Sequence, residues 1–285
     1  MKRRIWIASG LVCAAAIAAG SYLFLTKFDI YHETLSLKDS GRGRDVPVEL
    51  SLSRRALIKA KLGFGKPPVA IVNHGYTVKN SEYTFLANVL ASQGYMVASI
   101  QHDLPGDAPL SQTGFPFVGR MPMYERGMAN IDFAVDEIRK RYPGLDYSKL
   151  TMLGHSNGGD ISMFYAGHHP EKVQKIVTLD NLRVPFLMQG KFPILSFRSN
   201  DWKPDSGVVP ADEICAEHGI QLVHTNAQHV DMSDRGPEKV KEAIKNALSK
   251  FLNDVRQPSA PAQKPAPDAP QQQSQLMQTG SSKTE

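Results

Sequence analysis

The stretch Gly154-His155-Ser156-Asn157-Gly158 has the residue types and the spacing of a serine nucleophile. The apolar run 149–153 precedes it and a helical pattern follows it, so the serine is expected at a sharp turn between a strand and a helix. Its flanking glycines remove side chains that would collide with the neighbouring strand and helix. We therefore expect Ser156 to project its hydroxyl from a helix N-terminus, where developing negative charge is favoured. The alternative is that Ser156 only caps this helix.

A serine hydroxyl is a weak nucleophile and needs a neighbouring base. Where a serine occupies such a turn, an acid and then a histidine follow it along the chain. His229 lies in the loop between the last apolar run, 220–224, and the last helical pattern, and this is the place that the base requires. We therefore predict His229 as the base. The other histidines that follow the serine lie within or at the ends of expected helices and strands: His168, His169, His218 and His224.

The acid that orients the histidine is expected after the apolar run 193–197. Asp201 stands at the usual offset and is our prediction, with Asp205 as the alternative. Asp180, after the preceding run, is an outside candidate. The acid would hold His229 in the tautomer that accepts a proton and would stabilise the imidazolium.

Two backbone amides are expected to stabilise the oxyanion that forms when serine attacks a carbonyl. One belongs to Asn157, directly after the serine, and the other to Tyr76, in the turn His74-Gly75-Tyr76 that follows the apolar run 69–72. No second histidine or acid stands at metal-ligand spacing from His74, so a structural role is expected for it. The predicted chemistry needs no metal and no organic cofactor.

Short apolar runs alternate with longer amphipathic stretches through the middle of the chain. Such alternation indicates buried parallel strands joined by helices, and hence a doubly wound α/β sheet. Residues 30–65 are expected to form antiparallel leading strands, because apolar residues alternate there from Val46 to Leu52. The segment 104–123 has no periodicity and is rich in proline, glycine and phenylalanine, so we expect a lid-like insertion or a substrate wall. The runs are 69–72, 95–100, 149–153, 173–179, 193–197 and 220–224. The helical patterns are 82–93, 131–141, 211–217 and 237–251, together with a helix that follows Gly154 and ends at about Gly167.

The first 29 residues look like a membrane segment. Residues 5–25 are apolar or small almost throughout, which is about the length that crosses a bilayer, and three cations precede them. We predict an uncleaved transmembrane signal-anchor, with a cleaved signal peptide as the alternative. Either would export the folded domain, residues 30–256, to the periplasm of a Gram-negative cell or to the medium. Residues 257–285 are rich in proline and glutamine and are predicted to be a disordered tail.

Composition excludes several classes of protein. The chain of 285 residues is 41% hydrophobic and 21% charged, which excludes a wholly disordered protein. Most of the net charge of +5 lies in the N-terminal segment, so no basic domain is available to bind nucleic acid. With Cys13 and Cys215 as the two cysteines, neither an intrachain disulfide nor a cysteine-based zinc site is expected.

These motifs resemble the α/β-hydrolase superfamily over about residues 65–255. The run from Gly94 to Asp103 is similar to the branch of dienelactone hydrolases and platelet-activating-factor acetylhydrolases. The resemblance implies the α/β-hydrolase fold, with helices on both faces of a mostly parallel sheet. It also implies a carboxylesterase or lipase-like enzyme that cleaves esters through an acyl-enzyme. Dienelactone hydrolase uses cysteine where this chain has Ser156, so lactone substrates are not carried over.

The expected substrate is a small-molecule or lipid ester, and the sequence sets neither the acyl length nor the oligomeric state. A peptidase or an acyltransferase could use the same triad, since these differ only in the leaving group or the acceptor. The alternative from another class is a non-catalytic module of the same fold that recruits envelope partners through the anchor and the tail.

Overall fold

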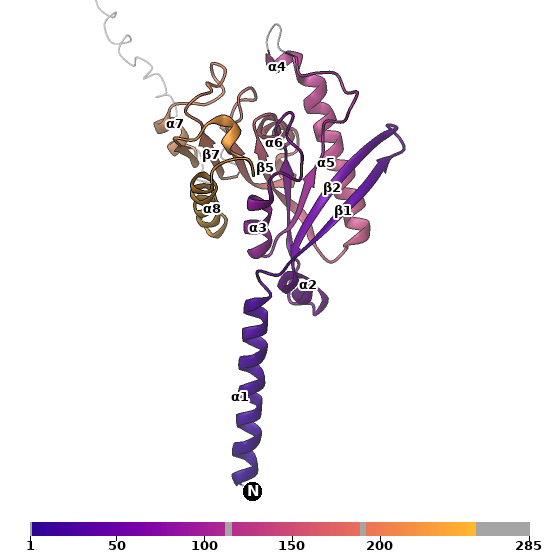
Figure 1. The fold of residues 1–285 in the computed structure, drawn as a ribbon, viewed down its shortest axis with the longest axis vertical. Coiled ribbons are helices and arrows are strands. Elements are labelled where there is room, and N and C mark those ends of the chain that lie inside the picture. Colours follow the sequence, from indigo (N-terminus) through magenta and orange to yellow (C-terminus); the bar gives the residue numbers. More distant parts are fainter. Residues whose placement is uncertain (1, 112–115, 189–191, 255–285) are drawn as a thin grey trace, which may run out of the picture.

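A twisted eight-stranded sheet forms the centre of the molecule in the computed structural model, which describes residues 2–111, 116–188 and 192–254 (Figure 1). The strands lie in the order β1-β2-β4-β3-β5-β6-β7-β8. The pairs β1–β2 and β2–β4 are antiparallel and the others are parallel, which confirms the predicted sheet. The strands are β1 Ile30–Asp39, β2 Arg44–Ser53, β3 Pro68–Asn73, β4 Met96–Ile100, β5 Asp146–His155, β6 Val173–Leu179, β7 Ile194–Arg198 and β8 Ile220–His224.

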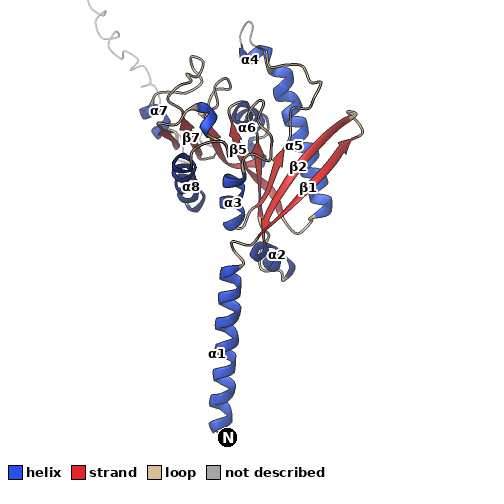
Figure 2. Ribbon diagram, in the orientation of Figure 1, coloured by secondary structure: helices blue, strands red, loops and turns tan. Residues whose placement is uncertain are grey.

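Helices cover both faces of this sheet (Figure 2). Residues of α5 and α6 belong to the apolar core on one face, and residues of α3 and α8 belong to the core on the other. Strands buried on both faces explain the continuous apolar runs of the sequence. The helices are α1 Lys2–Leu25, α2 Arg54–Lys61, α3 Thr84–Ser92, α4 Pro116–Gly119, α5 Met121–Arg141, α6 Asn157–His168, α7 Asp212–Glu217 and α8 Glu238–Asn253, with short 3₁₀ turns at Pro170–Lys172 and His229–Asp231.

Two helices differ from the prediction. Helix α2 directly follows β2, where only leading strands were expected. Helix α5 begins at Met121, ten residues before the expected helix at Ile131. Pro122 occupies its first turn, where a missing N–H costs nothing and the fixed φ suits a helix. The proposed insertion 104–123 is therefore a loop, the short helix α4 and the start of α5, while residues 112–115 lie outside the described residues.

Helix α1 extends away from the domain, on the side where α2 lies (Figure 1). Among the helices that the structure describes, none combines the length and the apolar character needed to cross a bilayer. The predicted membrane-spanning segment within residues 1–29 is thus not supported. The predicted disordered tail, residues 257–285, lies outside the described residues.

Candidate active site

Ser156 occupies a strained turn between β5 and α6. Its φ of 52° and ψ of −121° lie in a region that side-chain-bearing residues rarely adopt. A Cβ on Gly154 would lie 2.1 Å from the Gly158 carbonyl oxygen, and a Cβ on Gly158 would lie 2.1 Å from the Asn73 carbonyl oxygen. Both glycines are therefore sterically required, as the sequence predicted, and they allow α6 to begin directly against the end of β3.

A chain of hydrogen bonds links Ser156 to a buried carboxylate. The imidazole Nε2 of His229 lies 2.8 Å from the Ser156 Oγ, and the imidazole Nδ1 lies 2.6 Å from Oδ2 of Asp180. Because the Asp180 carboxylate accepts hydrogen bonds, Nδ1 carries the proton and Nε2 presents its lone pair to the serine hydroxyl. This is the tautomer that a general base requires.

Asp180 is fully buried directly after β6, with a positive φ of 57°. Burial raises the pKa of this carboxyl, but hydrogen bonds from His229 and Ser199 and the charge of Arg198 outweigh it and hold the pKa below its ordinary value. Ser199 donates from its amide (3.1 Å) and from its hydroxyl (2.7 Å), and the Arg198 guanidinium lies 2.9 Å away. The acid facing His229 therefore stays ionised at neutral pH.

The expectation that Asp201 orients the imidazole is wrong. The Asp201 carboxylate accepts a hydrogen bond of 2.8 Å from the backbone amide of His229, so it anchors the loop and not the ring. The alternative acid, Asp205, forms an ion pair with Arg183. Leu179, the last residue of β6, pairs with Phe197 of β7, and Asp180, with its positive φ, follows directly after this pair.

His155, the residue before the serine, connects the base loop to the turn after β3. Its Nε2 lies 2.9 Å from the His229 carbonyl oxygen and its Nδ1 lies 2.8 Å from the Tyr83 hydroxyl. A carbonyl only accepts, so Nε2 carries the proton and the Tyr83 hydroxyl donates to Nδ1. The same hydroxyl accepts from the Gly75 amide at 2.9 Å. Burial lowers the pKa of His155 to about 3, so this bridge is neutral.

The predicted oxyanion donors come from two different elements beside the serine, the start of α6 and the turn after β3. Asn157 is the first residue of α6, and Tyr76 lines a small pocket of about 80 Å³ together with Ser156 and His229. In the described part of the chain, neither the Tyr76 amide nor the Asn157 amide donates to a backbone carbonyl. Both amides are thus available for a ligand.

Trp202 covers the base. Its ring stacks on the His229 imidazole with centroids 4.6 Å apart and 15° between the planes. The indole remains 50% exposed, so it forms an outer wall of the site. Sequence reasoning did not single out Trp202, Tyr83 or the bridging role of His155.

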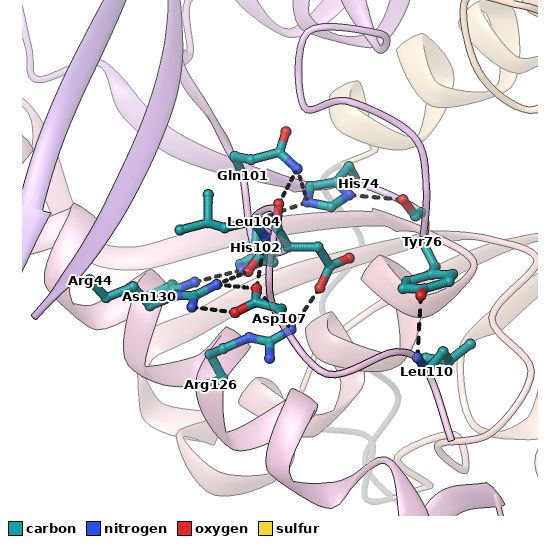
Figure 3. Close-up of polar contacts among 12 residues, drawn as sticks. Arg44, His74, Tyr76, Gln101, His102, Leu104, Asp107, Leu110, Arg126 and Asn130 are labelled. Atoms are coloured by element: carbon teal, nitrogen blue, oxygen red, sulfur yellow. Dashed lines mark hydrogen bonds and ion pairs between the residues drawn. The ribbon is translucent and has the colours of Figure 1, made fainter. Parts of the chain in front are cut away.

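His74 holds the two loops beside the pocket together (Figure 3). Its Nδ1 donates to the Gly75 carbonyl at 2.8 Å, and its Nε2 accepts from the His102 amide at 2.8 Å. Burial lowers the pKa of His74, which keeps it neutral. Across the described residues, no three side chains of His, Cys, Asp or Glu come together in a way that could hold a metal ion.

An ion-pair network fastens the loop after β4 (Figure 3). Arg44 of β2 contacts both carboxylate oxygens of Asp107, at 2.8 and 2.6 Å, and Arg126 of α5 lies 2.7 Å from Asp103. The hydrogen bonds from Arg44 lower the pKa of Asp107 to about 2. The Leu110 amide also donates to the Tyr76 hydroxyl at 3.3 Å. The described start of the predicted insertion is therefore tied to the oxyanion turn.

Known proteins resemble this chain in sequence over part of its length. A family model described as serine aminopeptidase, S33, matches residues 67–187. A probable serine hydrolase of Drosophila melanogaster is 30% identical over 79 residues, which are 27% of this chain and 24% of that protein. The match thus spans about a quarter of the relative's length.

Solved structures share the fold over most of the chain. A ferulic acid esterase from Streptomyces cinnamoneus has a TM-score of 0.53 and 18% identity, covering 78% of this chain and 87% of the other. A dienelactone hydrolase-like promiscuous phosphotriesterase, P91, from metagenomic libraries has a TM-score of 0.55 and 15% identity, covering 78% and 98%. Est1E from Butyrivibrio proteoclasticus has a TM-score of 0.54 and 14% identity, covering 77% and 97%.

Proposed function

Because the chain has the α/β-hydrolase fold and its residues 67–187 match a serine aminopeptidase family model, we propose that it is a serine hydrolase that cleaves carboxylic esters through an acyl-enzyme. The observation that carries the proposal is the unbroken series of hydrogen bonds from Asp180 through His229 to Ser156. A serine that only capped its helix would need neither a base at 2.8 Å nor a strained backbone.

The geometry supports the following mechanism. His229 Nε2 accepts the hydroxyl proton while Ser156 Oγ attacks the ester carbonyl carbon. The amides of Tyr76 and Asn157 stabilise the oxyanion, and the imidazolium then protonates the departing alcohol. His229 next removes a proton from water, which attacks the acyl-enzyme carbonyl, and it returns this proton to Ser156 Oγ as the acyl–oxygen bond breaks and the acid is released. Asp180 remains ionised throughout and orients the ring.

The small pocket supports a preference for short acyl groups. Its volume of about 80 Å³ is well below the roughly 300–1,000 Å³ of sites that enclose drug-sized ligands. We expect p-nitrophenyl acetate to be hydrolysed at least about tenfold faster, in kcat/KM, than the octanoate ester, because even one methylene that does not fit costs roughly 1–3 kcal/mol. Equal rates on both esters would contradict the preference without affecting the triad.

Active-site labelling with a fluorophosphonate tests the activity itself. We expect one label, on Ser156, which is lost in Ser156→Ala and reduced at least about 10²-fold in His229→Ala. Ser36→Ala, an exposed serine of β1, is the matched control and should label normally. Equal labelling of Ser156→Ala, or folded protein that neither labels nor hydrolyses short esters, would overturn the proposal.

A peptidase is the second candidate, and the serine aminopeptidase family model supports it. The same triad would then release an amine in place of an alcohol. Comparing aminoacyl p-nitroanilides with p-nitrophenyl esters separates the two, since an esterase should prefer the esters by several orders of magnitude. A non-catalytic module would fold normally and react with neither.

Export of the domain is proposed on the sequence of residues 5–25. Cell fractionation combined with N-terminal sequencing of the recovered protein tests it. Recovery with the membranes and an intact N-terminus is expected for an anchor, and a shortened protein outside the cytoplasm is expected for a cleaved signal. Recovery of intact protein in the cytosol would contradict both.

A further inference from the structure

A strongly basic surface lies at the edge of the sheet remote from Ser156. It consists of α2 and the turn after it, residues 54–66, and we name it the α2 surface. The segment contains no acid. Its five cations are Arg54, Arg55, Lys59, Lys61 and Lys66.

Most of this charge is not neutralised by the protein. Arg54 forms an ion pair of 2.5 Å with Asp29. The other four cations have no ion pair in the described part of the chain, and Lys59, Lys61 and Lys66 are exposed. A cluster of unpaired cations on one helix and its turn attracts an anionic surface.

Large apolar side chains stand among these cations. Phe64 is 73% exposed and Leu62 is 64% exposed, and they lie at the end of α2. Phe28 and Tyr31, at the start of β1, are 64% and 51% exposed. A groove of about 500 Å³ lies between these elements, lined in part by Tyr31, Leu57 and Lys61.

We propose that the α2 surface docks on a bilayer containing anionic phospholipid. Lysine and arginine beside exposed aromatic and aliphatic side chains are the combination that binds the headgroup region, where cations meet phosphate and apolar side chains enter the acyl boundary. Phosphate alone would account for the cations but not for the exposure of Phe64 and Leu62. Helix α1 leaves the domain on this same side (Figure 1).

The docked orientation carries a functional consequence that rests on the proposed function. The α2 surface lies where the parallel strands begin, since Leu52 at the end of β2 pairs with Met96 at the start of β4. Ser156 follows the opposite end of β5. A strand of five or six residues separates the two edges by roughly 20 Å. The mouth of the site therefore faces water, and the ester substrate comes from the aqueous phase.

Tryptophan quenching by brominated lipid tests which face meets the bilayer. Phe64→Trp and the matched control Val118→Trp, an exposed residue of α4 at the other edge, are made in the full chain. Vesicles contain brominated phosphatidylcholine and phosphatidylglycerol, and the signal of the parent protein is subtracted. We expect the emission of Phe64→Trp to fall by about half and that of Val118→Trp to be unchanged. Equal quenching of the two variants, or no quenching of Phe64→Trp, overturns the proposal.

Charge removal tests the lipid class. Each cation near an anionic bilayer contributes roughly fivefold to partitioning, so Lys59→Gln/Lys61→Gln should weaken binding to these vesicles roughly 25-fold. The control Lys38→Gln/Lys239→Gln removes the same charge from exposed lysines elsewhere and should change binding less than about twofold. Equal loss in both pairs would overturn the proposal.

Two further outcomes would also overturn the docking proposal. The first is that the parent protein binds equally well to vesicles with and without phosphatidylglycerol. The other is a dimer that forms without lipid and is lost in Lys59→Gln/Lys61→Gln, which would assign the α2 surface to a second copy. Fluorophosphonate labelling of the same samples reports the activity separately. Normal labelling without lipid contact would refute docking alone, and lipid contact without labelling would refute the hydrolase alone.

Discussion

Replacing Asp180 by asparagine should nearly abolish activity because it changes the tautomer of His229. The Oδ1 position of Asp180 accepts from the Ser199 amide at 3.1 Å and lies 2.9 Å from Arg198, so the oxygen of an asparagine amide will remain there. Its NH₂ group then occupies the Oδ2 position, 2.6 Å from His229 Nδ1, and donates to it. The proton of the ring moves to Nε2, which can no longer accept one from Ser156. The expected loss is about 10⁴ in kcat, or about 5 kcal/mol of transition-state stabilisation.

Asp201→Asn is the matched control, since it makes the same change in charge and volume at a second carboxylate that contacts His229. Its remaining oxygen can still accept from the His229 amide, so we expect less than about a tenfold loss. The assay is hydrolysis of p-nitrophenyl acetate, with thermal unfolding as the check on folding. A larger loss in Asp201→Asn than in a folded Asp180→Asn would refute the reasoning.

Three other predictions concern the surroundings of the site. Gly158→Ala should destabilise the domain by about 3 kcal/mol or more in urea unfolding, because its Cβ would lie 2.1 Å from a carbonyl oxygen. The control is Gly144→Ala, whose Cβ meets nothing within 4 Å and which should change the stability by less than about 0.5 kcal/mol. Tyr83→Phe removes the hydroxyl shared by the Gly75 amide and His155. It should lower the free energy of unfolding by about 1–3 kcal/mol and slow the labelling of Ser156 by the fluorophosphonate. Unchanged stability and labelling rate would show that the bridge is dispensable. The pKa of Asp107 is lowered to about 2 from 3.8, so this carboxylate contributes stability that is complete above pH 3.8 and is lost as the pH falls toward 2. The free energy of unfolding of Asp107→Asn should therefore depend less steeply on pH in this window than that of the parent protein. Parallel pH dependences of the two proteins would contradict the role of Arg44.

The residues that follow strands were predictable because each buried strand is a continuous apolar run. Ser156, His229 and Tyr76 each come directly or shortly after such a run, and the carboxyl ends of parallel strands meet at one edge. Their neighbourhood therefore follows from the pattern. Whether a given side chain turns toward its neighbours depends on local backbone angles, which the pattern does not contain.

The acid shows where this reasoning stops. Asp180 and Asp201 both follow strands and both reach His229, one at its ring and one at its backbone. The difference arises from the positive φ of Asp180 and the register of β6 against β7, and neither leaves a mark in the sequence. The ion pair of Arg44 with Asp107 joins residues 63 positions apart, and the sequence pattern does not predict it either.

Because Trp202 stacks face to face on His229, its fluorescence should report whether the imidazole is protonated. An indole ring in contact with an imidazolium loses fluorescence by electron transfer, whereas contact with a neutral imidazole leaves it bright. The chain has one other tryptophan, Trp6, so a Trp6→Phe protein would emit from Trp202 alone. The fluorescence intensity of Trp202 during turnover would then fall whenever the imidazole of His229 carries the second proton.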